Sequence, residues 1–332
     1  MNAGILAFSA RGEALAGRIA AFFSGRGDTP DASRCPSGGL ARWTAEHFHA
    51  DDALVFVSSC GIAVRAVAPH VRSKVSDPAV LVVDELGTFV IPLLSGHLGG
   101  ANELAGALAG FLGAAAVITT ATDINGLFAV DTWAKKQGLA IADPHAIKRV
   151  SSLLLHGQRV GLNSAFPVLG TPPAGVFLTE DGYDILISCA PVAQPEVLHL
   201  IPPVFTLGVG CRRGTPKEAF DRAFSSLLPS AGCHPAAIGK VCTIDLKADE
   251  PGLLAFCRER GLPLQCFSAE QLSAVPGSFS ASAFVCSVTG VDNVCERSAV
   301  LGGGEESRLV VRKTVLDGVT MALAAAPFTI QF

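Results

Sequence analysis

Short apolar runs with the length of buried strands recur along the first third of the chain, and apolar residues at helical spacing follow them. Gly4–Ser9 and Ala53–Val57 are two such runs, and Leu15, Ile19 and Phe22 lie on one helical face after the first. Strand-length runs that alternate with amphipathic helices are typical of a mostly parallel sheet covered on both faces. The pattern therefore predicts an α/β domain at the start of the chain.

The stretch from Val82 to Leu108 carries the most informative pattern. Two apolar runs, Val80–Val83 and Phe89–Leu94, flank Asp84-Glu85-Leu86-Gly87, which predicts a tight turn between two paired strands. The second run ends in Ser95-Gly96-His97-Leu98-Gly99-Gly100, after which leucines at four-residue spacing predict a helix. A glycine-rich loop between a strand and a helix leaves backbone N–H groups open to anionic groups.

His97 is the only side chain of this loop that titrates near neutral pH. Two interpretations are open: glycines that only permit a tight turn beside a surface histidine, or a ligand site in which His97 is an acid, a base or a hydrogen-bond donor. Small residues gathered around one histidine and one asparagine favour the ligand site. The residues of this loop that we assign to substrate binding are Ser95, Gly96, Gly99, Gly100 and Asn102.

Two further loops follow predicted strands. Ser58–Gly61 comes directly after Ala53–Val57, and Thr119–Asp123 follows a strand expected from Ala115. Because the carboxyl ends of parallel strands meet at one edge of a sheet, we expect both loops to converge with Ser95–Asn102. An arginine beside such a loop suits a carboxylate, although ordinary surface charge is an open alternative. The candidate contacts in these loops are Ser59, Cys60, Gly61, Arg65 and Thr120.

The pattern of apolar runs along the chain changes after residue 126. Short β-type runs separated by Pro and Gly turns indicate a smaller α+β domain over residues 127–202, in which Asp131 is expected to cap a helix over Thr132–Gln137. Strands and helices alternate again from residue 203 to residue 332. We therefore expect an α/β protein with two three-layer domains of the Rossmann or flavodoxin type, residues 1–126 and 203–332, flanking the middle domain. Two local expectations are a loop over Gly25–Gly39 and a strand over Phe284–Val288.

A second glycine-rich segment, Gly208-Val209-Gly210-Cys211-Arg212-Arg213-Gly214, follows a predicted strand. Thr215-Pro216-Lys217-Glu218 is expected to open the next helix with a capping box. The segment resembles a dinucleotide fingerprint, but its third glycine is displaced, which argues against NAD. Two arginines inside a loop suit a carboxylate better. We assign Gly208, Gly210, Cys211, Arg212 and Arg213 to substrate binding.

Composition narrows the class of protein. A length of 332 residues, 49% of them hydrophobic and only 16% charged, fits two or three compact α/β domains. A net charge of −4 argues against nucleic acid as a partner. No uncharged apolar run reaches the length of a membrane span and no signal peptide is recognisable, so we expect a cytoplasmic protein without a membrane partner. The 10 cysteines include no C-x-x-C pair, which favours reduced thiols and no metal site.

The segments DELGTFVIPLLSGHLGGANELA, VITTATDINGLFAVD, TLGVGCRRGT and SVTGVDNVCERSAVL resemble the CbiG family, the cobalt-precorrin-5A hydrolases of anaerobic cobalamin biosynthesis. The resemblance covers almost the whole chain, and its C-terminal part also resembles a stand-alone protein of the aerobic pathway. It implies a cobalt-bound tetrapyrrole substrate whose ring A δ-lactone is opened by water. The C20 two-carbon fragment then leaves as acetaldehyde, which gives cobalt-precorrin-5B. The cobalt belongs to the substrate, so no cofactor is expected. A homodimer and contacts with neighbouring pathway enzymes stay open.

Lactone opening needs an activated water, donors for the developing oxyanion and an acid–base group. We assign His97 as the base, with Asp123 or Glu85 as alternatives, and the backbone N–H groups of Gly96–Gly100 as oxyanion donors. Ser95 is a less favoured nucleophile because no G-x-S-x-G sequence surrounds it. The macrocycle is expected to bridge the N- and C-terminal loops, since ligands often bind between domains. Two other classes stay open: a non-catalytic tetrapyrrole carrier, and a nucleotide-dependent oxidoreductase that uses Gly208–Gly214.

Overall fold

The computed structural model describes residues 1–73, 76–97 and 99–332. These residues divide into two compact units, Met1–Lys135 with Ser151–Gln158, and Lys136–Val150 with Arg159–Phe332. Parallel strands joined by helices recur in both units, so the predicted α/β class is confirmed. The boundaries predicted at residues 126 and 202 stay a prediction.

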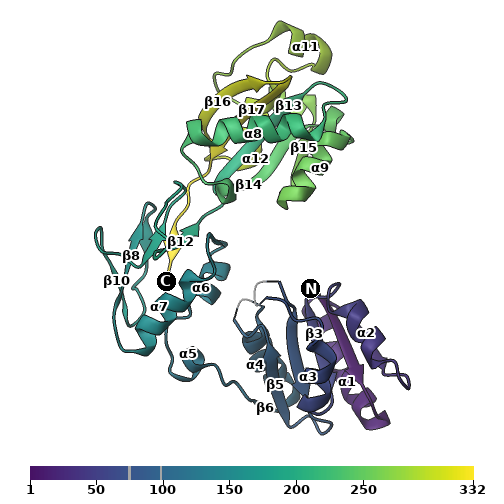
Figure 1. The fold of residues 1–332 in the computed structure, drawn as a ribbon. Coiled ribbons are helices and arrows are strands. Elements are labelled where there is room, and N and C mark those ends of the chain that lie inside the picture. Colours follow the sequence, from purple (N-terminus) through teal and green to yellow (C-terminus); the bar gives the residue numbers. More distant parts are fainter. Residues whose placement is uncertain (74–75, 98) are drawn as a thin grey trace. The chain divides into compact units, whose positions relative to one another are not determined.

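A six-stranded sheet is the centre of the first unit (Figure 1). Its strands are, in spatial order, β2 (Thr29–Arg34), β1 (Asn2–Ala7), β3 (Ala53–Val57), β4 (Ala79–Val83), β5 (Phe89–Leu94) and β6 (Ala115–Ala116). β2, β1, β3 and β4 are parallel, β5 is antiparallel to β4, and β6 is parallel to β5. The tight turn predicted before β5 is confirmed, because the N–H of Gly87 donates to the Asp84 carbonyl at 2.8 Å and Gly87 has a φ of 70°.

Helices cover both faces of this sheet. One face packs against α1 (Ala10–Gly25) and α4 (Ala101–Leu112), and the other against α2 (Leu40–His47) and α3 (Cys60–Val67). β3 and β4 are buried along their whole length, which explains why their sequences are apolar without alternation. The remaining helices of this part of the chain are α5 (Ala121–Ile124), α6 (Val130–Lys136) and α7 (Ala146–Leu155).

The reversal at β5 decides where the loops of the first unit lie. Val80, near the start of β4, pairs with Leu94 at the end of β5. The loop after β5 and the loop after β6 therefore lie at the edge where β1, β3 and β4 begin. Ser58–Gly61 follows β3 and lies at the opposite edge. The predicted convergence of three loops is thus wrong for Ser58–Gly61, because the hairpin between β4 and β5 turns the chain around.

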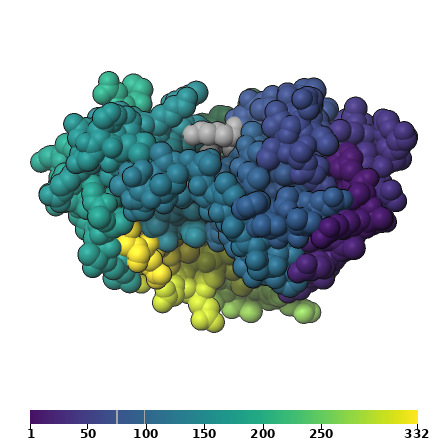
Figure 2. Space-filling view, turned by 90° about the horizontal axis from the view of Figure 1, so that it is seen from below, coloured from purple at the N-terminus to yellow at the C-terminus, as the bar shows by residue number. Residues whose placement is uncertain are grey.

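The second unit contains two five-stranded sheets. The first has the order β10 (Val176–Leu178), β8 (Val160–Ser164), β11 (Ile185–Ile187), β12 (Leu198–Ile201) and β7 (Ala140–Ile141). The second has the order β15 (Leu264–Phe267), β14 (Ile238–Ile244), β13 (Phe205–Cys211), β17 (Val319–Ala325) and β16 (Arg308–Leu316). A short pair, β18 (Ile330–Gln331) with β9 (Val168–Leu169), brings the end of the chain, yellow in Figure 2, to the surface of this unit.

The last five-stranded sheet is also covered on both faces. α8 (Lys217–Ala231) and α9 (Pro251–Arg260) pack on one face through a cluster that contains Phe220 and Phe256. α10 (Ala269–Ser273) and α12 (Val294–Gly303) pack on the other face, around Cys242 and Phe267. Two short 3-10 helices, Pro235–Ala237 and Asp245–Lys247, flank β14. None of the helices in the described ranges is long and apolar enough to cross a membrane.

Three local predictions are wrong, each for a local reason. Residues 284–288 belong to a helix, α11 (Ala283–Thr289), because Ser282 caps its start and Gly290, at φ 76°, ends it. The loop predicted over residues 25–39 contains β2, an edge strand whose residues are mostly exposed and so show no apolar period. The capping box before α8 is absent: the Thr215 hydroxyl donates to the Arg212 carbonyl at 2.7 Å, and Pro216 occupies the N-cap.

Candidate functional site

Two carboxylates flank His97 at the edge of the first sheet where β5 and β6 end. Nε2 of His97 lies 3.0 Å from Oδ2 of Asp123, and Nδ1 lies 3.4 Å from Oδ1 of Asp131. The side chain of His97 is 19% exposed and that of Asp131 only 6%. Because a carboxylate only accepts hydrogen bonds, this geometry is satisfied when both ring nitrogens carry a proton.

The charges of the cluster follow from this geometry. The hydrogen bond to Asp131 is the main factor that raises the pKa of His97 from 6.5 to about 9; burial opposes it, and the charges of Asp131 and Asp123 add to it. Burial alone would raise the pKa of Asp131, but the hydrogen bond and charge of His97 lower it below its ordinary value. His97 is therefore an imidazolium at neutral pH, which suits an acid or a cationic donor rather than the base that we predicted.

Asn102, at the start of α4, orients the second carboxylate. Its Nδ2 donates to Oδ2 of Asp123 at 2.6 Å and to the Thr120 hydroxyl at 2.9 Å. The hydroxyl of Thr122 lies 3.2 Å from Nε2 of His97. Among the described residues these contacts use only Oδ2 of Asp123, so Oδ1 is open to a ligand or a water. The loops after β5 and β6 do converge, as predicted.

The loop after β5 owes its tight path to small residues. Ser95 has a φ of 58°, and its hydroxyl donates to the Asp77 carbonyl at 2.9 Å in a buried contact. A Cβ on Gly99 would collide with Ser95, and a Cβ on Gly96 would lie 2.8 Å from the side-chain oxygen of Asn102. The Ser95 hydroxyl is therefore part of the loop structure, which argues further against Ser95 as a nucleophile.

The backbone N–H groups of this loop are only partly open. The N–H of Gly100 donates to the His97 carbonyl at 2.9 Å, so the prediction of Gly100 as an oxyanion donor is wrong. Within the part of the chain that the structure describes, the N–H groups of Gly96 and Gly99 donate to no protein acceptor. These two groups are therefore the oxyanion donors that we retain from the prediction. Leu98 lies outside the described residues.

The other predicted residues of the first unit lie at the opposite edge of the sheet. Glu85 accepts a hydrogen bond from the Ser9 hydroxyl, beside the ends of β1 and β4. Nη1 of Arg65 donates to the Gly61 carbonyl at 3.1 Å, and both residues are exposed. The structure therefore does not bring these side chains to His97. The residues concerned are Ser59, Cys60, Gly61, Arg65 and Glu85.

Asp131 is the residue of this cluster that sequence reasoning missed. It was predicted as a helix cap, but it is the second residue of α6, and its Oδ1 accepts from the N–H of Thr132 at 2.9 Å while facing His97. The signal in the sequence was an acid directly after the apolar run Phe128–Val130. A carboxylate at such a position is rarely buried without a partner of opposite charge.

A cavity of about 510 Å³ opens at the end of β13 in the second unit. Its walls are mainly apolar side chains from the ends of β14 and β16 and from α11 and α12, while four cations line it as well. The apolar members are Ile244, Leu246, Phe284, Val285, Val288, Val294 and Val315, and the cations are Arg212, Arg213, Lys247 and Lys313. Gly210, Cys211, Arg212 and Arg213 therefore line one cavity.

The glycines of this region serve packing. Gly208 and Gly210 lie inside β13 rather than in a loop, which corrects the predicted Gly208–Gly214 loop. A Cβ on Gly208 would collide with the Cys295 carbonyl, so glycine lets α12 approach the strand. A Cβ on Gly210 would lie 2.5 Å from the Thr320 hydroxyl on β17. Gly208 is therefore a packing position.

The residues after β13 do not form a phosphate cradle. The N–H of Gly214 donates to Oε1 of Glu250 at 2.6 Å, and Glu250 is 1% exposed. A buried carboxylate thus takes up the Gly214 N–H, which is then not available to a phosphate. This arrangement argues against the nucleotide-dependent oxidoreductase.

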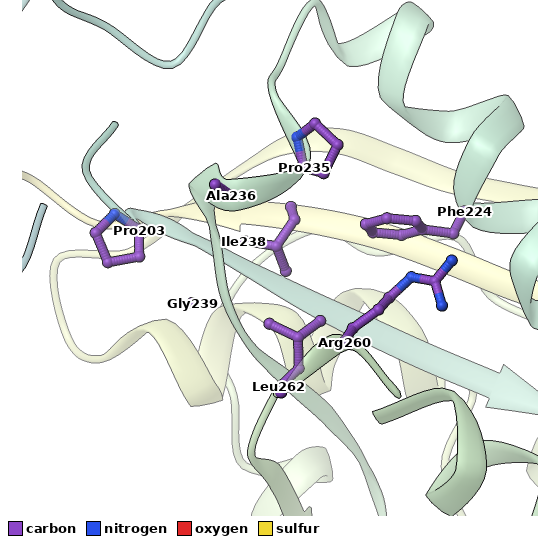
Figure 3. Close-up of a pocket in the computed structure, with 9 residues that line it drawn as sticks. Pro203, Phe224, Pro235, Ala236, Ile238, Gly239, Arg260 and Leu262 are labelled. Atoms are coloured by element: carbon purple, nitrogen blue, oxygen red, sulfur yellow. The ribbon is translucent and has the colours of Figure 1, made fainter. Parts of the chain in front are cut away.

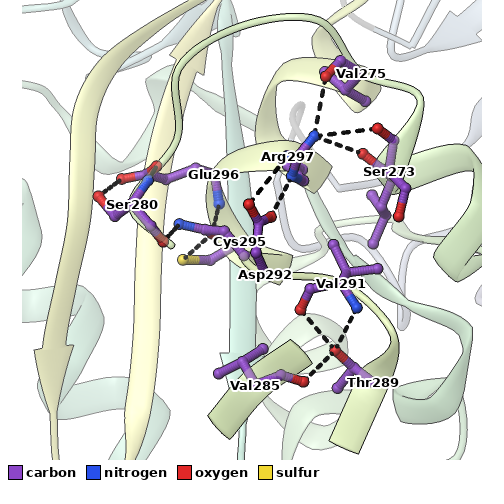
Figure 4. A network of polar contacts seen from close by, with 12 residues as sticks. Ser273, Val275, Ser280, Val285, Thr289, Val291, Asp292, Cys295, Glu296 and Arg297 are labelled. Carbon is purple, nitrogen blue, oxygen red and sulfur yellow. Dashed lines mark hydrogen bonds and ion pairs between the residues drawn. The ribbon is translucent and has the colours of Figure 1, made fainter. Parts of the chain in front are cut away.

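A polar network fixes the frame of the cavity (Figure 4). The fully buried Glu296 accepts from the N–H and hydroxyl of Ser280 at 2.8 and 2.9 Å, and from the N–H of Lys313 at 2.8 Å. Arg297 pairs with Asp292 at 2.7 Å and donates to the Val275 carbonyl at 3.0 Å. These bonds tie α12 to β16 and to the segments on either side of α11.

A second cavity, of about 370 Å³, lies at the opposite end of the same sheet (Figure 3). Its one charged lining residue is Arg260, whose Nη1 lies 2.8 Å from Asp221 and whose guanidinium lies 4.5 Å from the ring centroid of Phe256. The charge of Arg260 is thus neutralised inside the protein. In the described ranges, no three His, Cys, Asp or Glu side chains are placed to hold a metal ion.

Three family models match the chain in order. They are described as cobalamin synthesis G N-terminal over residues 42–123, cobalamin biosynthesis central region over residues 128–193, and cobalamin synthesis G C-terminus over residues 205–324. The first match contains His97 and Asp123, the second contains Asp131, and the third contains the cavity-lining residues of β13 and α11.

Similar proteins of known name include two that match most of the chain and one that matches a smaller part. A cobalt-precorrin-5A hydrolase from Salmonella typhimurium is 37% identical over 87% of this chain and 86% of its own length. One from Priestia megaterium is 29% identical over 88% of this chain and 83% of its own length. Protein CobE from Sinorhizobium is 34% identical over only 38% of this chain but 81% of its own length.

Proposed function

Because the chain belongs to the cobalt-precorrin-5A hydrolase family, we propose that it opens the ring A δ-lactone of cobalt-precorrin-5A with water, releases acetaldehyde and yields cobalt-precorrin-5B. The observation that carries this conclusion is the similarity over nearly the whole chain to enzymes of that name. The cluster of His97, Asn102, Asp123 and Asp131, called the His97 cluster below, supplies a base and a cationic group for this chemistry. The cobalt arrives with the substrate, and we propose that no cofactor takes part.

The first step is attack of water on the lactone carbonyl. Asp123 is the base in our proposal, because Oδ1 is open while His97 and Asn102 hold Oδ2. The N–H groups of Gly96 and Gly99 are the donors for the carbonyl oxygen as it becomes an oxyanion. This assignment retains Asp123 from the sequence alternatives and leaves out Glu85, which lies at the other edge of the sheet.

The second step is collapse of the tetrahedral intermediate, which breaks the lactone C–O bond and leaves an alkoxide on C20. The imidazolium of His97 stabilises this alkoxide by its positive charge, while its Nε2–H stays on Oδ2 of Asp123. The bond between C20 and the macrocycle then breaks, its electron pair passes to the electron-poor ring, and the alkoxide oxygen becomes the carbonyl of acetaldehyde. Asp131 touches neither water nor substrate in this scheme; it holds the ring of His97 from the Nδ1 side.

The test of this function is acetaldehyde release from cobalt-precorrin-5A under anaerobic conditions by the wild type, His97→Ala and the control His49→Ala, whose histidine is exposed. We expect release by the wild type and the control and a loss of at least a hundredfold in His97→Ala. Release at the wild-type rate by His97→Ala would remove His97 from the mechanism. Binding without any acetaldehyde from the wild type would favour the non-catalytic carrier.

The division into domains, the location and the partners of the protein are part of the same proposal. We propose two three-layer α/β domains, residues 1–126 and 203–332, with an α+β domain over residues 127–202 between them in the sequence. We also propose a cytoplasmic location, a homodimer and transfer of the product to the next pathway enzyme. Limited proteolysis tests the domain boundaries, and light scattering tests the dimer. That the loops Ser95–Asn102 and Gly208–Gly214 face one cleft stays a prediction.

A further inference from the structure

We propose that the cavity of about 510 Å³ beside β13 is a tetrapyrrole-holding site, in which apolar walls cover one face of the ring while Arg212 and Lys313 bind its carboxylate arms. The inference rests on the proposed function for the identity of the ring. It goes beyond that function by assigning the holding of the substrate to a site that contains none of the His97 cluster.

The apolar wall of the cavity is unusually exposed for a folded protein. Phe284 is 75% exposed, Val288 63% and Val315 65%, and all three line the cavity. α11, which carries Phe284 and Val288, contains no buried residue. Large apolar side chains gathered around one cavity mark a surface that a ligand or partner covers. A flat apolar ring fits such a wall.

The cations of the cavity differ in whether an acid neutralises them. Nη1 of Arg213 lies 3.6 Å from Asp249, and Nζ of Lys247 lies 3.5 Å from the buried Glu250. Over the ranges that the structure describes, Arg212 and Lys313 have no acidic partner. Two unneutralised cations beside an apolar wall select a ligand that is both apolar and anionic.

The cavity at the other end of this sheet offers the opposite chemistry. Its Arg260 is paired with Asp221 and stacked against Phe256, so an anionic ligand finds no free charge there. The distribution of unpaired cations therefore singles out the cavity beside β13. A ring with many acetate and propionate arms is complementary to it.

The cavity beside β13 has the properties of a site that binds a ligand and does not react with it. Glu296 and its partners fix the backbone of Ser280 and Lys313 on both sides of α11, so the frame exists before a ligand arrives. Burial raises the pKa of the thiols of Cys211 and Cys295 to about 11, so both are neutral at physiological pH. Neither is a thiolate nucleophile under those conditions.

Calorimetric titration of the full chain with cobyrinic acid, a stable cobalt corrin with free carboxylates, tests this assignment. The variants are Arg212→Gln combined with Lys313→Gln, the control Arg308→Gln, whose exposed arginine does not line the cavity, and Phe284→Ser. The same titrations use the heptamethyl ester of cobyrinic acid, which keeps the ring and lacks the charges. The replaced side chains are exposed or half-buried, so we expect all variants to fold.

We expect the double variant to bind cobyrinic acid at least tenfold more weakly than the wild type and Arg308→Gln, and to bind the ester as the wild type does. Phe284→Ser should weaken binding of both ligands severalfold. Unchanged affinity in both cavity variants, or equal losses for acid and ester in the double variant, would overturn the assignment. Acetaldehyde release by the same preparations separates the two proposals: release with unchanged binding would leave the hydrolase standing and remove the holding site.

Discussion

The His97 cluster and the cavity beside β13 differ in nearly every physical property. Around His97, two carboxylates face the two nitrogens of one titratable ring, and an asparagine holds one of these carboxylates. The pKa of the ring is raised to about 9. The cavity is walled by exposed apolar side chains, its thiols are neutral, and two of its cations have no acidic partner among the residues that the structure describes. In our proposals the first region moves protons, and the second binds an anionic ligand with an apolar face.

The glycines show the same difference. Gly96 and Gly99 let a loop turn tightly around His97 and leave N–H groups open, whereas Gly208 lets a helix approach a strand. The same residue type therefore permits a tight loop in one region and close packing of a helix on a strand in the other. We therefore expect that separate mutations can remove the catalytic chemistry and the binding of the tetrapyrrole.

The largest expected effect is on turnover by Asp123→Asn. Loss of the base should lower kcat by about a hundred- to ten-thousandfold, because an amide cannot accept the proton of water. Binding of cobyrinic acid should stay within twofold of the wild type, since Asp123 is not part of the cavity. Acetaldehyde assays and calorimetry on one preparation measure both. The control is Asp181→Asn, an exposed aspartate of the second unit.

Gly208→Ala should have the next largest effect, on stability. The added methyl group would meet the Cys295 carbonyl and the Ala299 nitrogen, which we expect to lower the free energy of unfolding by about 2–3 kcal/mol. The matched variant is Gly110→Ala in α4, where a Cβ meets nothing within 4 Å. It should stabilise the protein by about 0.5–1 kcal/mol. Equal effects in chemical denaturation would contradict the packing role of Gly208.

The pH profile sharpens the role of His97. As an acid it should support turnover until pH rises through about 9, where the imidazolium loses its proton. Asp131→Asn removes the main partner that raises this pKa, so the alkaline limb should move down towards 6.5. Turnover at pH 8 should then fall at least about tenfold relative to that at pH 6. An alkaline limb that does not move would mean that Asp131 only supports the fold.

The smallest expected effect is the pH dependence of folding. Because the pKa of His97 is higher in the folded chain than its ordinary 6.5, its contribution to stability is complete below pH 6.5 and is lost as pH rises to about 9. Between pH 7 and 8 the free energy of unfolding should fall by about 1 kcal/mol. Asp131→Asn should flatten this slope, as urea titrations at several pH values would show. The same slope in Asp131→Asn would contradict this origin.

Much of the first unit could be predicted because the local sequence of each strand and turn carries a recognisable pattern. β3 and β4 are buried throughout, so their sequences are apolar runs. The turn before β5 is predicted by the residues Asp84–Gly87. The meeting of His97 with Asp123 followed from two βα units in succession. That the loops after β3 and β5 lie at opposite edges of the sheet could not be predicted. The direction of β5 depends on the strand with which it pairs, and this pairing is decided by the whole sheet.

What could not be predicted depends on contacts between distant segments. Asp131 reads as a helix cap until the fold places His97 against it. Gly208 reads as part of a loop until α12 is seen to pack on β13. Phe284 reads as a strand residue because it lies in an apolar run, while the helix is decided by Ser282 and Gly290 at its ends.

The separation of chemistry from holding is tested most directly by measuring acetaldehyde release and cobyrinic acid affinity side by side in two proteins, Asp123→Asn and the combined Arg212→Gln and Lys313→Gln variant. We predict that the first loses turnover and keeps binding. The second should lose binding and recover turnover when the substrate is saturating. Parallel loss of both properties in both variants would show that the two regions do not act separately, and would contradict the proposed separation of chemistry from holding.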